Sequence, residues 1–133
     1  MASIWYADSS ALVTFFAIEP ESGALLEAIS GPSIVTSAVA LVEVPRAMGR
    51  LGLPHPGASV FARLDIVPLS ADVIARAASL PPVTLRSLDA IHIASALSLD
   101  TRCDGLFTYD RQVTAAARAA GLSVRSPGLA ETP

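Results

Sequence analysis

Short runs of apolar residues alternate with longer stretches in which apolar residues recur at helical spacing, and this pattern continues along most of the chain. The short runs predict strands at residues 4–7, 33–36, 66–68, 105–108 and 122–124. The longer stretches predict helices at residues 9–16, about 19–30, 38–51, about 57–64, 71–80, about 87–99 and 111–120. Strands that alternate with helices favour a mainly parallel sheet with helices on both faces.

Serine and proline mark several of the expected boundaries. Ser9 or Ser10 is a candidate cap for the first helix, and Ser70 for the helix at 71–80. Pro45 lies inside the stretch at 38–51, so this helix should either kink there or be shorter than its apolar pattern. No repeat, charge block or low-complexity linker divides the sequence. We therefore expect one domain over residues 1–133, with its core at about 3–126 and a short tail at 127–133.

The composition is rich in hydrophobic residues (52%) and poor in charged ones (16%), which argues against disorder. It also makes each charge inside an apolar run informative. A single cysteine, Cys103, excludes a disulfide framework and a cysteine-based zinc site. No basic region precedes the first apolar stretch, and no apolar run approaches the ~18 residues of a membrane span. These features predict a soluble, cytoplasmic protein.

All nine basic residues are arginines, because the chain contains no lysine. P-loop nucleotide sites and Schiff-base enzymes both depend on a lysine, so these classes are excluded. The net charge of −3 argues against a protein that binds nucleic acid through a basic surface alone. It leaves room for nucleic-acid chemistry in which bound cations supply the positive charge.

Four of the twelve acidic residues lie beside apolar segments: Asp8, Glu43, Asp89 and Asp110. Asp8 and Asp110 each follow a predicted strand, at the sheet edge where such folds bind ligands. Each acid also has a purely structural interpretation. Asp8 and Asp110 can cap helices, Asp89 can favour the positive end of its helix, and Glu43 can pair with Arg46.

The four acids taken together favour a metal site over four separate structural roles. Buried carboxylates are costly unless they are protonated or bind a cation, and few basic residues lie near enough in sequence to neutralise four of them. Mg²⁺ and Mn²⁺ prefer oxygen ligands and are typically held by a few carboxylates with water and substrate phosphate. Such sites hydrolyse phosphodiesters, often with two ions.

The motifs that contain these acids resemble a known family. They are D-S-S-A-L-V from Asp8, E-V-x-R from Glu43, L-D-A-I-H-I-A-S-A-L around Asp89 and T-Y-D ending at Asp110. In order and spacing they resemble the PIN domain, in particular the small VapC ribonuclease toxins of prokaryotic toxin–antitoxin pairs, over residues 6–124. The resemblance implies an α/β/α sandwich with a central, mainly parallel sheet. It also implies a metal-dependent endoribonuclease that a VapB antitoxin holds inactive.

The resemblance assigns roles to individual residues. Asp8, Asp89 and Asp110 would bind the principal Mg²⁺ or Mn²⁺ ion, and Glu43 would contact it through water or help to hold a second. Ser9 and Thr108 match hydroxyl positions of the family, and we expect them to orient the carboxylates or the attacking water.

Other residues have more than one interpretation. Arg86, Arg46 and Arg111 are candidates for RNA contact or for structural ion pairs, which use the same bidentate geometry. His92 lies three positions after Asp89, where a packed histidine is favoured over a catalytic base. The chain is rich in apolar residues, and with the family resemblance this makes the segments Val13–Leu26 and Ala38–Leu53 candidates for a homodimer face and an antitoxin groove.

Two other classes of function compete with the ribonuclease toxin. A non-enzymatic PIN module that binds RNA or a partner is the alternative, and the four intact acids count against it. A phosphoryl-transfer protein of the receiver or dehalogenase type also places an aspartate after its first strand, but it uses a lysine that this chain lacks. No motif specifies the target RNA.

Overall fold

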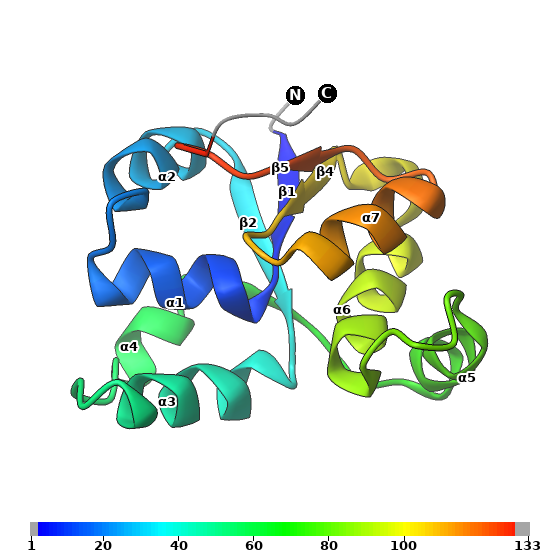
Figure 1. The fold of residues 1–133 in the computed structure, drawn as a ribbon, viewed down its shortest axis with the longest axis horizontal. Helices are drawn as coiled ribbons and strands as arrows, with labels where there is room; N and C mark the ends of the chain where they lie inside the picture. Colours follow the sequence, from blue (N-terminus) through cyan, green and yellow to red (C-terminus); the bar gives the residue numbers. More distant parts are fainter. Residues whose placement is uncertain (1–2, 130–133) are drawn as a thin grey trace.

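Five parallel strands form the centre of the structure, a computed structural model that describes residues 3–129 (Figure 1). Their order in the sheet is β3-β2-β1-β4-β5. The strands are β1 (Ile4–Ala7), β2 (Ser33–Ser37), β3 (Asp65–Val67), β4 (Gly105–Phe107) and β5 (Val124–Arg125). The all-parallel pairing confirms the predicted sheet.

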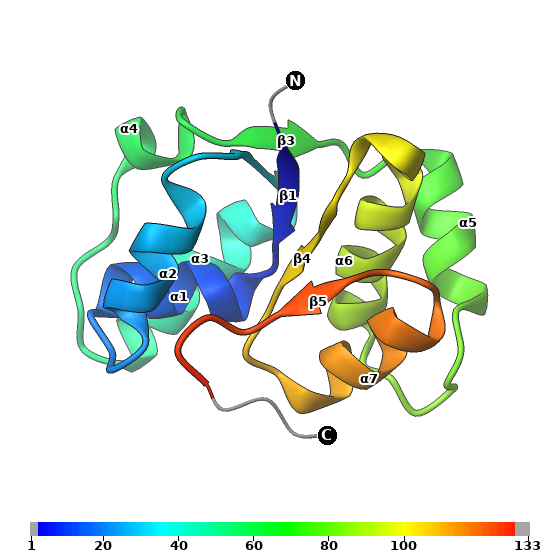
Figure 2. The same cartoon turned by 90° about the horizontal axis from the view of Figure 1, so that it is seen from above.

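Helices cover both faces of this sheet, which confirms the predicted α/β/α sandwich (Figures 1 and 2). One layer contains α1 (Ser9–Ala17), α2 (Ser22–Ile29), α3 (Ala40–Arg50) and α4 (Ala58–Phe61). The other contains α5 (Ala71–Ser79), α6 (Ser87–Ser98) and α7 (Arg111–Ala119). A 3-10 turn at Asp100–Arg102 connects α6 to β4. Within residues 3–129, no helix combines the length and the apolar character needed to cross a bilayer.

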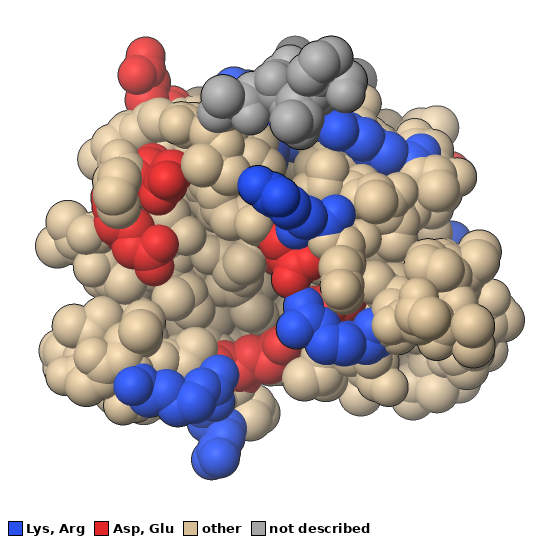
Figure 3. Space-filling view, in the orientation of Figure 1, with Lys and Arg blue, Asp and Glu red and all other residues tan. Residues whose placement is uncertain are grey.

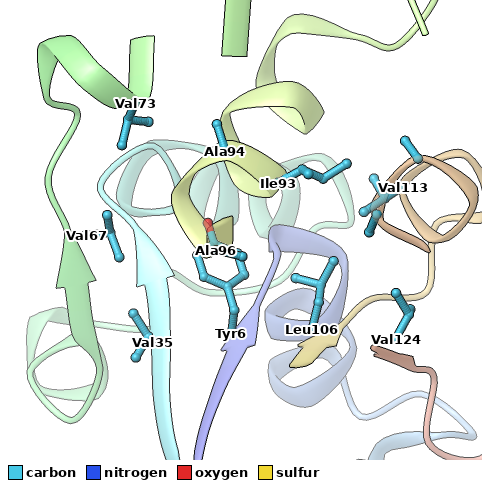
Figure 4. Close-up of a cluster of buried hydrophobic side chains, with 12 residues drawn as sticks. Tyr6, Val35, Val67, Val73, Ile93, Ala94, Ala96, Leu106, Val113 and Val124 are labelled. Carbon is cyan, nitrogen blue, oxygen red and sulfur yellow. The ribbon is translucent and has the colours of Figure 1, made fainter. Parts of the chain in front are cut away.

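Each face of the sheet has its own hydrophobic core, because side chains alternate along a strand. Tyr6, Val35 and Leu106 point from neighbouring strands toward α6 (Figure 4). Ala7 and Phe107, the next residues of β1 and β4, belong to the core on the opposite face. The central strands are therefore buried on both sides, as their continuous apolar runs predict.

The element boundaries depart from the sequence prediction where side chains or tight turns compete with regular structure. Of the candidate caps for α1, the structure selects Asp8 over Ser9 and Ser10, and the Asp8 carboxylate accepts a hydrogen bond from the Ala11 amide at 3.0 Å. Helix α2 begins only at Ser22, whose hydroxyl accepts from the Glu19 amide at 2.7 Å and closes a turn.

The last helix and the last strand also differ from their predicted bounds. After α7 the chain turns at Gly121, which has a positive φ of 95°, and the Leu122 amide donates to the Ala117 carbonyl at 3.0 Å. Leu122, which the sequence assigns to the strand, belongs to this turn, so β5 begins only at Val124. Pro45 does not end its helix, since α3 continues from Ala40 to Arg50, slightly shorter than the predicted 38–51. Of the predicted tail at 127–133, residues 130–133 lie outside the described residues.

The topology places a binding site beside β1. The chain leaves β1 toward β2 on one side and returns later to β4 on the other, so the direction of winding reverses there. The Asp8 amide donates to the Phe107 carbonyl at 3.2 Å and joins the carboxyl ends of the two strands. Residues that follow β1 and β4 are therefore brought together at one edge.

Gly105 provides a test of how tightly β1 and β4 pack. A Cβ atom there would lie 2.5 Å from the Trp5 ring and 2.8 Å from the Ser123 carbonyl oxygen. We expect Gly105→Ala to lower the free energy of unfolding, measured in urea, by about 1–3 kcal/mol. Gly49→Ala is the control, because nothing lies within 4 Å of that Cβ position in α3. It should raise stability by about 0.5–1 kcal/mol. Equal stabilities for the two variants would contradict the packing described here.

Candidate active site

The four acids singled out in the sequence line one cavity of about 340 Å³ at the carboxyl edge of the sheet. They come from four places in the fold: the end of β1, helix α3, the first turn of α6 and the start of α7. Figure 3 shows acidic atoms at the centre of this face with basic atoms on both sides. The remaining lining residues are Ser9, Ser10, Arg86, Ser87, Leu88 and His92.

Asp8 is the deepest of these acids, with 2% of its surface exposed. Its Oδ1 accepts hydrogen bonds from the Ala11 amide at 3.0 Å and the Ser10 hydroxyl at 2.6 Å. Its Oδ2 accepts from the Thr108 hydroxyl at the end of β4. Burial raises the pKa of Asp8, although the charge of His92 and these hydrogen bonds act in the opposite direction. The carboxylate is therefore held rigidly but lacks a full counter-charge.

Thr108 and Ser10 connect the two strand ends that carry the site. Besides donating to Asp8, the Thr108 hydroxyl accepts from the Asp110 amide at 3.1 Å, so one hydroxyl orients two of the acids. Ser10 accepts from the Tyr109 amide at 2.9 Å. The structure thus gives Thr108 the kind of contact expected of it. Ser10 was missed, since the sequence offers it only as a possible cap.

Glu43 lies beside a buried histidine. Its Oε1 accepts a hydrogen bond from Ser9 at 2.7 Å and lies 2.7 Å from His92 Nε2. Although burial alone would raise the pKa of Glu43, these hydrogen bonds and the charges of His92 and Arg86 lower it. Within residues 3–129 Glu43 makes no ion pair with Arg46, contrary to the structural interpretation of its sequence.

Arg86 joins the other two acids. Its Nε donates to Asp89 at 2.8 Å and its terminal nitrogen donates to Asp110 at 2.6 Å. Asp110 also caps α7 by accepting from the amides of Gln112 and Val113 at 2.8 and 3.0 Å. The two carboxylates raise the pKa of Arg86, which stays fully charged. One positive charge therefore bridges two carboxylates, on a side chain that remains 64% exposed.

Arg46 and Arg111 lie on exposed helical positions and form no ion pair among the described residues. A second arginine of α3, Arg50, lines a neighbouring cavity of about 380 Å³ that shares Ser9, Ser10 and Glu43 with the first. Nothing in the sequence singles out Arg50, because the other residues that line this second cavity come from distant segments of the chain.

The donor chemistry of the cavity fits a hard divalent cation, with four carboxylates and three serine hydroxyls around one space. Across residues 3–129, however, no three acidic, histidine or cysteine side chains converge closely enough to hold an ion. Arg86 bridges Asp89 and Asp110, and Asp8 is turned toward its hydroxyl partners. Asp8, Asp89, Asp110 and Glu43 could hold a cation once Arg86 releases its two acids.

Comparison with known proteins gives matches over most of the chain. The model of the PIN domain matches residues 5–119. "Ribonuclease VapC47" of Mycobacterium tuberculosis (strain CDC 1551 / Oshkosh) is 37% identical in an alignment of 133 positions. The alignment covers 92% of this chain and 96% of that protein. "Ribonuclease VapC46" of M. tuberculosis (strain ATCC 25618 / H37Rv) is 39% identical over 130 residues, with 96% and 99% covered.

Two solved structures are similar in fold. A toxin–antitoxin complex from Klebsiella pneumoniae contains a chain with a TM-score of 0.68 and 23% identity, covering 92% of this chain and 97% of that one. M. tuberculosis VapC20, described as a sarcin-ricin loop cleaving toxin, has a TM-score of 0.68 and 20% identity, with 91% and 97% covered. At these identities the structural matches support the fold alone.

The raised pKa of Asp8 predicts a pH dependence of stability. Between the unfolded pKa and the higher folded pKa the folded state binds more protons, so the free energy of unfolding falls as pH rises through this window. Asp8→Asn keeps a capping side chain without charge. In EDTA we expect this variant to be more stable than the wild type at pH 7 and to lose the advantage below about pH 4. Thermal melts from about pH 3 to 8, with exposed Asp72→Asn as control, would detect this. A variant less stable at every pH would contradict it.

The position of Arg86 predicts competition with a cation. In EDTA, Arg86→Gln should lower the free energy of unfolding by about 1 kcal/mol or less, because the guanidinium is largely exposed. Added Mn²⁺ should raise the melting temperature of this variant more than that of the wild type, since no guanidinium has to be displaced. Arg118→Gln, at the far end of α7, is the matched control. The same Mn²⁺ response in all three proteins would exclude the competition.

Proposed function

This chain belongs to the PIN-domain family and, within it, to the VapC proteins, and from this premise we propose that it is a metal-dependent endoribonuclease. It would hydrolyse RNA phosphodiester bonds as the toxin of a toxin–antitoxin pair. The observation that carries the proposal is the convergence of Asp8, Glu43, Asp89 and Asp110 on one cavity from four separate elements. We further propose that residues 1–133 form a single PIN domain that acts in the cytoplasm, where its RNA substrate would be.

The acids have distinct roles in this proposal. Asp8, Asp89 and Asp110 would hold the principal Mg²⁺ or Mn²⁺, and Glu43 would contact it through water or help to hold a second ion. When bound, the metal would lower the pKa of a water nucleophile and neutralise charge on the phosphate. Thr108 supports this arrangement by orienting Asp8 and Asp110 from one hydroxyl group. Ser9 supports it by donating to Glu43.

The arginines around the cavity would bind the RNA backbone. Arg46 and Arg111 are exposed, on helices of opposite layers, so that a strand crossing the cavity would meet a guanidinium on each side. Arg86 would join them when it releases its two carboxylates. A guanidinium binds phosphate through two parallel hydrogen bonds, which gives these contacts direction as well as charge. The proposal therefore needs no basic net charge.

The apolar surface supports the proposed protein partners, a second copy of the chain and a VapB-type antitoxin in a toxin–antitoxin hetero-oligomer. A largely apolar cavity of about 780 Å³ lies between α1, α2, α4 and β2, lined among others by Phe15, Phe16 and Leu26. These residues belong to the predicted segment Val13–Leu26. In the segment Ala38–Leu53, Val42 is 62% exposed and Leu51 56% exposed. Neither segment is fully packed within one monomer, as both partner hypotheses require.

Cleavage of total cellular RNA by the purified chain tests the activity directly. With Mg²⁺ or Mn²⁺ we expect discrete fragments that disappear in EDTA. Asp89→Asn should reduce the rate by about 100-fold or more, because loss of even an indirect metal contact costs 10–100-fold. Asp72→Asn is the matched control, since Asp72 also lies in the first turn of a helix but outside the cavity.

The same experiment separates the proposed enzyme from the binding module. An intact RNA pool with every metal, together with RNA binding that Asp89→Asn leaves unchanged, would refute the nuclease and favour the non-enzymatic module. The sequence of the fragment ends would identify the target.

A further inference from the structure

His92 is a buried histidine in contact with the site, and neither of its ring nitrogens is free. The side chain is 1% exposed and projects from α6 one turn after Asp89. Its Nδ1 lies 2.6 Å from the Tyr6 hydroxyl, and its Nε2 lies 2.7 Å from Glu43 Oε1 and 3.0 Å from the Ser9 hydroxyl. A histidine that only filled space would not need partners from three other elements.

The two ring nitrogens of His92 have different partners. A carboxylate only accepts hydrogen bonds, so His92 Nε2 carries the hydrogen that it shares with Glu43. The other ring nitrogen, Nδ1, is in hydrogen-bond contact with the Tyr6 hydroxyl. Because the ring is held at both ends, Tyr6 fixes the orientation in which His92 presents Nε2 to Glu43.

Glu43 needs such support more than the other acids do. Asp8 and Asp110 are held by backbone amides as helix caps, and Asp89 by the guanidinium of Arg86. Glu43 lies in the first turn of α3, where its long side chain has no capping contact and would otherwise sample several rotamers. Both of its donors, Ser9 and His92, act on Oε1. Among residues 3–129, Oε2 receives no hydrogen bond and remains available to the cavity.

We propose that His92, oriented by Tyr6, is a positioning residue that fixes Oε1 of Glu43 and leaves Oε2 for a divalent cation or its water. The pair also connects the two helical layers, because Glu43 belongs to α3 and His92 to α6, on opposite faces of the sheet. The inference rests on the proposed metal-dependent function of the same cavity. It predicts that changes at His92 alter metal affinity even when no RNA is present.

Calorimetric titration of the full chain with Mn²⁺, without RNA, tests the inference. His92→Leu should weaken Mn²⁺ binding about 10-fold or more, in line with the loss of groups that orient metal ligands. His92→Gln places an amide donor near the position of Nε2 and should recover much of the affinity. Tyr6→Phe removes only the phenolic hydroxyl and should weaken binding less than His92→Leu. The metal concentration for half-maximal RNA cleavage should shift in the same order.

Ile93→Val is the matched control for packing. Ile93 lies on the same helix, is fully buried in the hydrophobic core, and has no polar atom in its side chain with which to contact a site residue. This variant should lose stability while binding Mn²⁺ like the wild type. If His92→Leu does not fold, Tyr6→Phe carries the test. Wild-type affinity in Tyr6→Phe, or in a folded His92→Leu, would overturn the positioning role.

The outcomes also distinguish this inference from the proposed function. Binding of Mn²⁺ that depends on His92, in a protein that cleaves no RNA, would support the positioning role and refute the nuclease. Metal-dependent cleavage with unchanged Mn²⁺ binding in the His92 variants would do the opposite. A wild-type chain that binds no Mn²⁺ would refute both.

Discussion

The burial of one carboxylate at the end of the central strand is the constraint on which the site depends. Asp8 is excluded from solvent, so its oxygens must find donors inside the protein. The donors come from the turn after β1 and from the end of β4, which are 100 positions apart in the chain. Satisfying this group therefore aligns the two strands whose ends carry the site. The hydrogen bonds only partly offset the desolvation, so a cation beside Asp8, as in the proposed metal site, would stabilise its charged form.

The other three acids are held in place by side chains of opposite or polar character. A guanidinium lies between Asp89 and Asp110, and a buried imidazole supports Glu43. Asp89 and Asp110 thus share one partner and Glu43 has another, and no three of the described acidic or histidine groups share one centre. Bringing the four acids around one cation would require a rearrangement of these contacts. Movement of the Arg86 side chain into solvent is the smallest such rearrangement. Of the two partners, the guanidinium is largely exposed and the imidazole is buried.

Much of the fold and the identity of the acids could be predicted from the sequence, because both depend on local signals. Apolar runs predicted the strands, and the positions of Asp8 and Asp110 after two of them predicted the edge at which they meet. The contacts among the site residues could not be predicted. Ser10, Tyr6 and His92 acquire their roles only when β1, β4 and α6 pack together. Arg86 pairs with two acids, and Glu43 contacts His92 instead of Arg46. Both contacts depend on side-chain geometry that the apolar periodicity of the sequence does not encode.

The distribution of the site along the chain has a consequence for its synthesis. Asp8 leaves the ribosome 100 residues before Thr108, and Asp110, which completes the cavity, follows later still. Until β4 and α7 have been synthesised, the chain cannot bury Asp8 or close the sheet beside it. The cavity therefore forms only after its last acid has been added. For the proposed ribonuclease, this order of assembly would delay activity until the domain has folded.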